Sequence, residues 1–132
     1  MPNMTGRVRS VIVYIVDDDE AVREGFTKLI RSAGLDPRPY GSAEHFLGEV
    51  VDAQDACILL DITMPCMTGT QVQAQLQSRK LLLPVITVSA HDDEETRFWA
   101  RSLGARMFLR KPVDDQALLD AIHWVTSPNH RS

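Results

Sequence analysis

The sequence has few cysteines, no long apolar run and no excess of basic charge. Its two cysteines, Cys57 and Cys66, are too few for a disulfide framework in a chain of 132 residues. Unpaired thiols are typical of a reducing compartment, so we expect a cytoplasmic protein. No apolar stretch approaches the roughly 20 residues of a membrane-spanning helix, and residues 1–10 lack the apolar centre of a secretory signal.

The net charge of the chain bears on the partners that it can bind, and its length bears on the number of domains. The formal net charge is −4 at pH 7, which gives no reason to expect binding to nucleic acid or to a membrane surface. The length suits one hydrophobic core and leaves too little chain for a second folded module. We therefore expect one domain over residues 11–125, between a polar N-terminal tail at 1–10 and a segment at 126–132 that is a tail or the start of a linker.

Short strand-like segments alternate with segments of helical periodicity. We expect strands at Val11–Val16, Asp36–Tyr40, Ala56–Leu60, Pro84–Ser89 and Met107–Arg110. We expect helices at Glu20–Ala33, from a Ser42 cap to about Val50, at Thr68–Ser78, Asp93–Leu103 and Asp114–Val125. This alternation predicts an α/β protein with a parallel sheet between two helical layers.

The second expected strand contains Pro37 and Pro39, which lack the backbone N–H that a sheet uses. Two missing donors on the same side of a strand are tolerated only at a sheet edge. An edge position for this strand favours a flavodoxin-like, doubly wound (βα)5 three-layer sandwich whose five parallel strands have the order 2-1-3-4-5.

Polar side chains stand at the ends of four expected strands. Asp17 and Asp18 follow the first strand, Asp61 the third and Lys111 the fifth, while Ser89 ends the fourth. The carboxyl ends of parallel strands share one edge of the sheet, so these groups should converge. Three carboxylates beside a hydroxyl and an ammonium suit a hard divalent cation and a phosphoryl group.

Asp61 is the candidate nucleophile of this set. A carboxylate can attack a phosphoryl group and form an acyl phosphate, provided that a metal lies close enough to neutralise the incoming oxygens. Asp61 stands alone at its strand end, opposite the candidate metal ligands Asp17 and Asp18. Lys111 offers a point charge for a phosphoryl oxygen, and Ser89 offers a hydroxyl donor.

The chain resembles the receiver domain of two-component response regulators over about residues 11–125. The likeness is carried by Asp17-Asp18, by Leu60–Pro65, by Ser89-Ala90 and by Lys111-Pro112; Val16–Glu20 and Met64–Gly69 are most similar to the FixJ-like subgroup. The resemblance implies a signalling switch that is not an enzyme with a substrate of its own. Such a switch takes a phosphoryl group from a sensor histidine kinase and catalyses only its own phosphorylation and dephosphorylation.

The resemblance also implies a role for each position of the site. Asp61 would be the phospho-acceptor and a ligand of Mg²⁺, or of Mn²⁺ in its place. Asp18 would ligate the metal directly, Asp17 mainly through water, and Thr63 through its backbone carbonyl. Lys111 would bind the phosphoryl group, and its bond to the following proline would be cis.

A second group of residues would transmit or modulate the signal. Ser89 would move toward the phosphate, and Phe108 would turn inward behind it as an aromatic switch. Thr63 and His91 occupy positions that tune dephosphorylation in relatives, although His91 could equally be an ordinary exposed histidine. Cys66 replaces a customary glycine of the loop after Asp61, which leaves open either a redox role or a plain substitution.

The fourth helix and fifth strand form the dimer contact in relatives, so we expect a phosphorylation-dependent homodimer. Trp99 on that helix is a candidate interface residue, since tryptophan is favoured at interface centres. Phe98 and Leu103 are expected to face the sheet instead. Relatives usually continue into a DNA-binding domain that would regulate transcription, but these residues contain none, and we expect no nucleic-acid or membrane contact through this domain.

Two other classes remain open. The first is a receiver-like scaffold that works without phosphorylation, although every chemical position is filled. The second is a Mg²⁺-dependent phosphohydrolase of the haloacid dehalogenase type, which also uses an aspartate after a strand. That family needs Thr or Val four residues after its nucleophile, whereas Ala21 follows Asp17 at that spacing.

Overall fold

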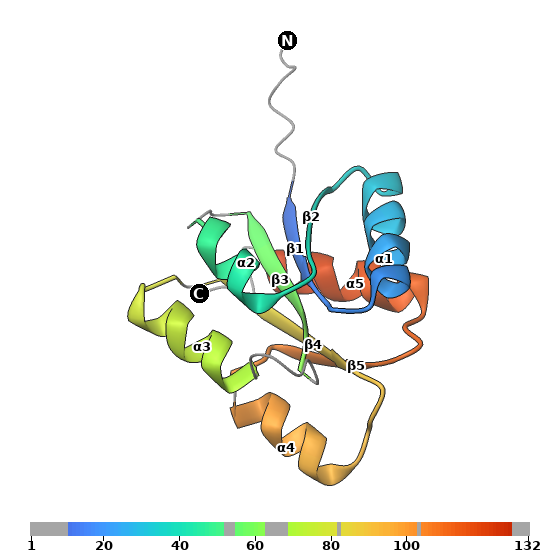
Figure 1. Cartoon of the computed structure of the whole chain (residues 1–132). Helices are drawn as coiled ribbons and strands as arrows, with labels where there is room; N and C mark the ends of the chain where they lie inside the picture. The colour runs from blue at the N-terminus through green and yellow to red at the C-terminus, as the bar shows by residue number, and fades with distance from the viewer. Residues whose placement is uncertain (1–10, 52–54, 63–68, 82, 103, 128–132) are drawn as a thin grey trace.

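The computed structural model describes residues 11–51, 55–62, 69–81, 83–102 and 104–127. Five strands and five helices alternate along the chain (Figure 1). The strands are β1 (Ile12–Val16), β2 (Asp36–Tyr40), β3 (Ala56–Asp61), β4 (Val85–Ser89) and β5 (Met107–Arg110). The helices are α1 (Glu20–Ser32), α2 (Ala43–Glu49), α3 (Gly69–Ser78), α4 (Glu94–Ser102) and α5 (Asp115–Thr126). The predicted elements are therefore all present, with ends that agree to within about two residues.

The sheet is parallel throughout and has the order β2-β1-β3-β4-β5, which confirms the predicted flavodoxin-like topology. Among the described strands, β2 lies at one edge and pairs with β1 alone, where its residues Pro37 and Pro39 lie opposite Val13 and Ile15. A strand with two such residues can occupy an edge because one of its sides needs no partner.

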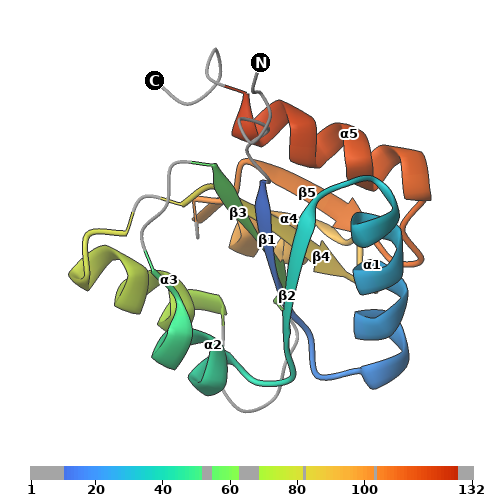
Figure 2. The ribbon, with the colours of Figure 1, turned by 90° about the horizontal axis from the view of Figure 1, so that it is seen from above.

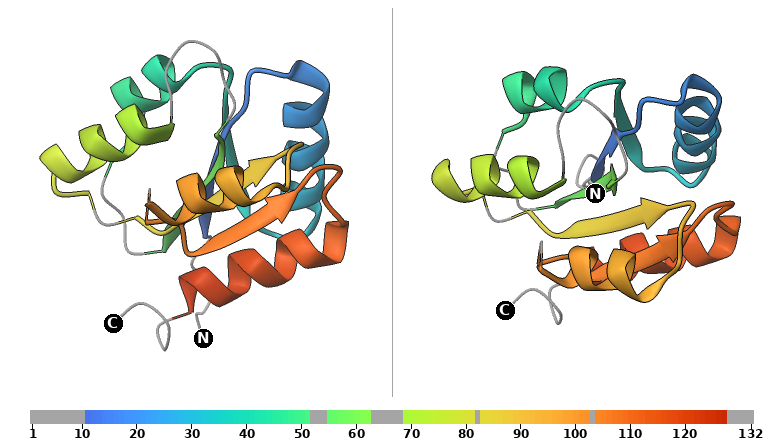
Figure 3. Two further views of the ribbon diagram at one scale, coloured as in Figure 1. Left: turned by 90° about the horizontal axis from the view of Figure 1, so that it is seen from below. Right: turned by 60° about the horizontal axis from the view of Figure 1, so that its bottom comes forward.

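Helices cover both faces of the sheet, with α1 and α5 on one face and α2 and α3 on the other (Figure 2). Figure 3 shows α2 and α3 side by side on their face. The period of two in a strand sends Val13 and Ile15 toward α1 and α5, and Tyr14 and Val16 toward the opposite layer. The central strands β1 and β3 are consequently apolar along almost their whole length.

Short polar side chains fix the starts of the helices that flank the site. Asp19 accepts a hydrogen bond from the Val22 amide at 3.2 Å at the start of α1, and Ser42 does the same for the His45 amide at 3.1 Å in α2. Gly34 follows α1 with φ of +83°, a left-handed conformation that suits glycine at a helix end. These caps set where the chain leaves the sheet and returns to it.

The prediction that Phe98 faces the sheet is wrong, because this side chain is 62 % exposed. Ala100 is the buried residue of α4, and Thr96 is half-buried. Residues two apart on a helix point about 200° away from each other. Phe98 lies two residues from both Thr96 and Ala100, so it points to solvent.

Several predictions fall on parts that the structure does not describe. They concern Thr63, Cys66, Thr68 and Leu103, and the side chain of Trp99. Every helix in the described part of the chain is too short or too polar to cross a lipid bilayer.

Candidate functional site

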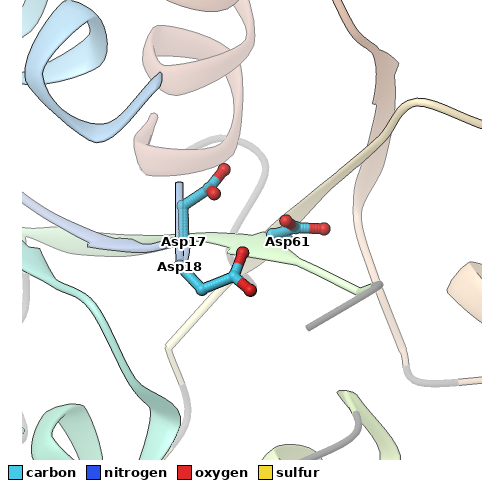
Figure 4. Close-up of side chains that lie close together, drawn as sticks. All are labelled: Asp17, Asp18 and Asp61. Atoms are coloured by element: carbon cyan, nitrogen blue, oxygen red, sulfur yellow. The ribbon is translucent and has the colours of Figure 1, made fainter. Parts of the chain in front are cut away.

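The sheet topology brings the predicted carboxylates together. β1 and β3 are neighbours, and Val16 lies opposite Leu60, so the residues that follow them reach the same edge. Ligand oxygens of Asp17, Asp18 and Asp61 all lie within 4.8 Å of one another (Figure 4). The predicted acidic site therefore exists as a cluster in space.

The three carboxylates differ in their access to solvent. Asp17 is completely buried, Asp61 is 4 % exposed, and Asp18 is exposed. An incoming ion would therefore find two buried carboxylates inside the sheet edge and one carboxylate facing solvent.

Lys111 supplies the positive charge of the site. Its Nζ lies 2.9 Å from Asp17 Oδ2 and 3.2 Å from Asp61 Oδ2. Its backbone amide donates to the Ser89 carbonyl at 2.8 Å, which holds the residue beside β4, and its bond to Pro112 is cis, as the resemblance implies. Burial alone would lower the pKa of Lys111, but the close carboxylates of Asp17 and Asp61 outweigh it and raise the pKa.

The Asp17 carboxylate is completely buried and only partly hydrogen-bonded. Its Oδ1 accepts a hydrogen bond from the Asp19 amide at 2.9 Å, whereas its buried Oδ2 accepts none, although Lys111 Nζ is close. Burial, with a further contribution from the charge of Asp61, raises the pKa of Asp17 despite the nearby ammonium. Hard oxygen donors with an unsatisfied buried atom among them fit a divalent cation such as Mg²⁺.

Arg23 is a site residue that the sequence did not indicate. Its Nη1 donates to the Asp17 backbone carbonyl at 2.8 Å, so it steadies the chain where the acidic pair leaves β1. A Cβ atom at Gly41 would lie only 3.0 Å from this Nη1, so a larger residue there would require the Arg23 side chain to shift. No sequence pattern marks an arginine on α1 as the partner of a particular carbonyl.

Ser89 reaches the same edge from the next strand. Asp61 lies opposite Val88, so Ser89 lies one residue further toward the carboxyl end of the neighbouring strand. Ser89 is completely buried, and its Oγ accepts a hydrogen bond from the His91 amide at 3.0 Å. His91 itself is exposed.

Phe108 lies away from the carboxylates, in the middle of β5. It pairs with Thr87 of β4 and is half-buried against the cluster that includes Ala100.

Fold and site together define a class of protein. The family of response regulator receiver domains matches residues 13–123, and the chain belongs to this family. It is 40% identical over 114 residues to the response regulator protein TodT of Pseudomonas putida, across 86% of this chain and 50% of that protein. It is 37% identical over 113 residues to the transcriptional regulatory protein FixJ of Azorhizobium caulinodans, across 86% of this chain and 54% of FixJ. These similarities support the FixJ-like subgroup.

A solved structure agrees with this assignment. The response regulator StyR superposes with a TM-score of 0.82 at 39% identity, over 92% of this chain and 61% of the StyR chain. The chain thus spans about half the length of the curated relatives it matches.

Proposed function

We propose that Asp61 accepts a phosphoryl group from a sensor histidine kinase in a reaction that requires Mg²⁺ or Mn²⁺. The observation that carries this proposal is the convergence of three carboxylates within 4.8 Å, two of them in contact with the Lys111 ammonium. A purely structural role would not justify burying Asp17 and Asp61 side by side, because each ion costs several kcal/mol to desolvate (about 5 or more for the pair).

The metal would be held by carboxylates of Asp17, Asp18 and Asp61, with the Thr63 backbone carbonyl as a further ligand. Asp18 is exposed and would ligate directly, whereas the deeper Asp17 would act mainly through water. Bound there, the metal would neutralise charge on the phosphoryl oxygens and on the carboxylates. The buried carboxylate of Asp17 would then be balanced by the metal as well as by the Lys111 ammonium.

Three residues of this chain act in the phosphoryl transfer, namely Asp61, Lys111 and Ser89. An Asp61 oxygen forms a bond to phosphorus while the phosphorus–nitrogen bond of the kinase phosphohistidine breaks. Lys111 leaves its ion pair with Asp61 and pairs with a phosphoryl oxygen. Ser89 donates a hydrogen bond from its hydroxyl to another phosphoryl oxygen. When the signal ends, water hydrolyses the acyl phosphate at a rate that Thr63 and His91 modulate.

Phosphorylation would then change the face formed by α4 and β5. Ser89 would move toward the phosphate, and Phe108 would turn inward behind it. Phe98 supports a contact role for this face, because a large apolar side chain that is 62 % exposed is available to a partner. The partner we propose is a second copy of this chain, with Trp99 also at the interface.

The partners and location follow from the same proposal. A sensor histidine kinase would supply the phosphoryl group on the cytoplasmic side of the membrane. This domain would contact neither nucleic acid nor lipid, and any control of transcription would be exerted elsewhere.

The test is intact mass after incubation with acetyl phosphate and Mg²⁺. We expect one phosphoryl adduct on the natural chain, none with EDTA and none on Asp61→Asn. The matched control is Asp120→Asn, which makes the same change on the exposed surface of α5 and should leave the adduct unchanged. An adduct that survives in Asp61→Asn, or forms equally in EDTA, would refute the proposal.

A second experiment distinguishes the proposed phospho-acceptor from a scaffold that works without phosphorylation. If no adduct forms, beryllofluoride with Mg²⁺ can be added as a stable mimic of the phosphorylated state. Failure of both reagents on a folded chain would favour a scaffold that works without phosphorylation. A phosphohydrolase would instead release phosphate from small phosphate esters in many turnovers.

A further inference from the structure

Arg97 of α4 connects the loop after β4 with the Phe108 ring. Its guanidinium carbon lies 5.2 Å from the centroid of the ring, within the range of a cation–π contact. Its Nε donates to Asp92 Oδ1 at 2.5 Å. Asp92 belongs to the loop that follows Ser89, whereas Phe108 belongs to β5, and α4 lies next to β5 (Figure 3). One side chain thus contacts both segments that the proposed switch must move.

The loop that holds Asp92 is anchored at each end. Ser89 Oγ accepts a hydrogen bond from the His91 amide at 3.0 Å. Asp93 Oδ1 accepts one from the Thr96 amide at 2.8 Å and so caps α4. Asp92 lies between these two bonds. A movement of Ser89 toward a phosphoryl group would therefore displace Asp92 relative to the capped helix.

The ring has room to change position. A cavity of about 120 Å³ lies between α4 and β5, and its lining includes Arg97, Ala100 and Phe108. Phe108 is only half-buried, so packing alone does not fix the ring on that side. The guanidinium is the polar group that covers it in this conformation.

We propose that Arg97 is a positioning residue that holds Phe108 in its resting place until the loop after Ser89 moves. This inference rests on the proposed function, since it concerns the step between phosphorylation of Asp61 and the change in the α4 and β5 face. Asp92 orients the planar guanidinium over the ring, and its displacement removes that orientation. A contact made in only one of two conformations biases the equilibrium toward that conformation.

The effect of the Arg97 contact on the conformational equilibrium has a predicted size and direction. Arg97 is about half exposed, with 53% of its side chain accessible, so its contact with the ring belongs to the weaker, solvated class. Its loss should raise the population of the switched conformation roughly two- to fivefold. The rate of phosphorylation by acetyl phosphate should rise by up to the same factor, because the conformation that the phosphoryl group stabilises is then reached at a lower cost.

A double-mutant cycle tests whether Arg97 acts through the ring. The four proteins are the natural chain, Arg97→Met, Phe108→Leu and the double variant, each assayed for its Mg²⁺-dependent phosphorylation rate by intact mass. We expect Arg97→Met to accelerate the natural chain and to have no effect when Phe108 is already leucine. Asp92→Asn should act in the same direction, and Arg97→Lys should restore part of the slow rate. Arg31→Met, which removes the same charge from an exposed position of α1, is the matched control.

A spectroscopic measurement reports the ring directly. Fluorinated phenylalanine can be incorporated, and the Phe108 signal identified by its absence in Phe108→Leu. In Arg97→Met that signal should shift from its resting position toward the position seen with beryllofluoride. An unshifted signal, a slower rate in Arg97→Met, or effects that simply add in the cycle would each overturn the inference. Absence of phosphorylation on the natural chain would instead refute the proposed function, and this inference with it.

Discussion

Replacing Asp17 by asparagine should make the metal-free protein more stable while abolishing the stabilisation by Mg²⁺. The change removes one buried charge, keeps the side-chain volume and leaves an oxygen that can accept the Asp19 amide. Asp17 is completely buried, and its Oδ2 has no hydrogen bond. The loss of hydration on burying this charge is therefore offset mainly by the Lys111 ammonium.

The size of this stability change follows from the distances between the Asp17 carboxylate and its charged neighbours. At an effective dielectric constant of about 20, the Lys111 ammonium at 2.9 Å attracts the Asp17 carboxylate by about 6 kcal/mol. Asp61, whose ligand oxygen lies within 4.8 Å, repels it by at least about 3.5 kcal/mol. Desolvation costs several kcal/mol more (roughly 3 to 5), so the ionised Asp17 destabilises the metal-free fold by about 1 to 3 kcal/mol.

The stability gained in Asp17→Asn should depend on pH in a definite direction. Burial raises the pKa of Asp17, so the folded chain holds this proton more tightly than the unfolded chain does. The destabilisation is absent below the ordinary aspartate pKa of about 3.9 and grows as the pH rises through the raised folded value. The advantage of Asp17→Asn should therefore be larger at neutral pH than in mild acid.

Urea unfolding followed by tryptophan fluorescence measures this effect in EDTA and in millimolar Mg²⁺. We expect Asp17→Asn to exceed the natural chain in EDTA by about 1 to 3 kcal/mol, with a much smaller gain on adding Mg²⁺. Asp120→Asn is the matched control and should behave as the natural chain does. The reasoning is refuted if Asp17→Asn is no more stable in EDTA, or gains as much from Mg²⁺ as the natural chain.

Three further predictions concern Lys111, Cys57 and a helix cap. Lys111→Met leaves Asp17 and Asp61 without their ammonium, so unfolding in EDTA should require about 3 to 5 kcal/mol less, and Mg²⁺ should restore part of the loss in the same urea assay. The Lys111 pKa is raised, so its stabilising effect should be complete below about pH 10 and be lost as the pH rises through the raised value. Burial raises the pKa of the Cys57 thiol to about 12, so peptide mapping should find Cys57 unalkylated in the native chain at pH 8 and alkylated in urea. Asp114→Ala removes the N-cap of α5 and should lower the free energy of unfolding by about 1 kcal/mol, measured in Mg²⁺.

The sheet and its order could be predicted because they depend on local pattern. Pro37 and Pro39 place β2 at an edge through a missing backbone donor, which is a property of the residues themselves. The convergence of Asp17 and Asp61 follows once β1 and β3 are neighbours, since a parallel sheet aligns strand ends.

Features that depend on tertiary packing were not predictable in the same way. The prediction that Phe98 faces the sheet is wrong because Ala100, two residues further along α4, lies on the face that meets the sheet. The contact of Arg23 with the Asp17 carbonyl depends on how α1 lies against the sheet edge. The contact of Arg97 with Phe108 joins two elements whose spacing no local pattern encodes.

The identity of the carboxylate that is phosphorylated is the central claim, and borohydride reduction tests it most directly. Reduction of an aspartyl phosphate gives homoserine at the modified position, which sequencing of peptides by mass spectrometry can locate. After treatment with acetyl phosphate and Mg²⁺, we predict homoserine at residue 61 alone. Homoserine at residue 17 or 18, or none in a chain that carries the phosphoryl adduct, would contradict the assignment of Asp61 as the acceptor.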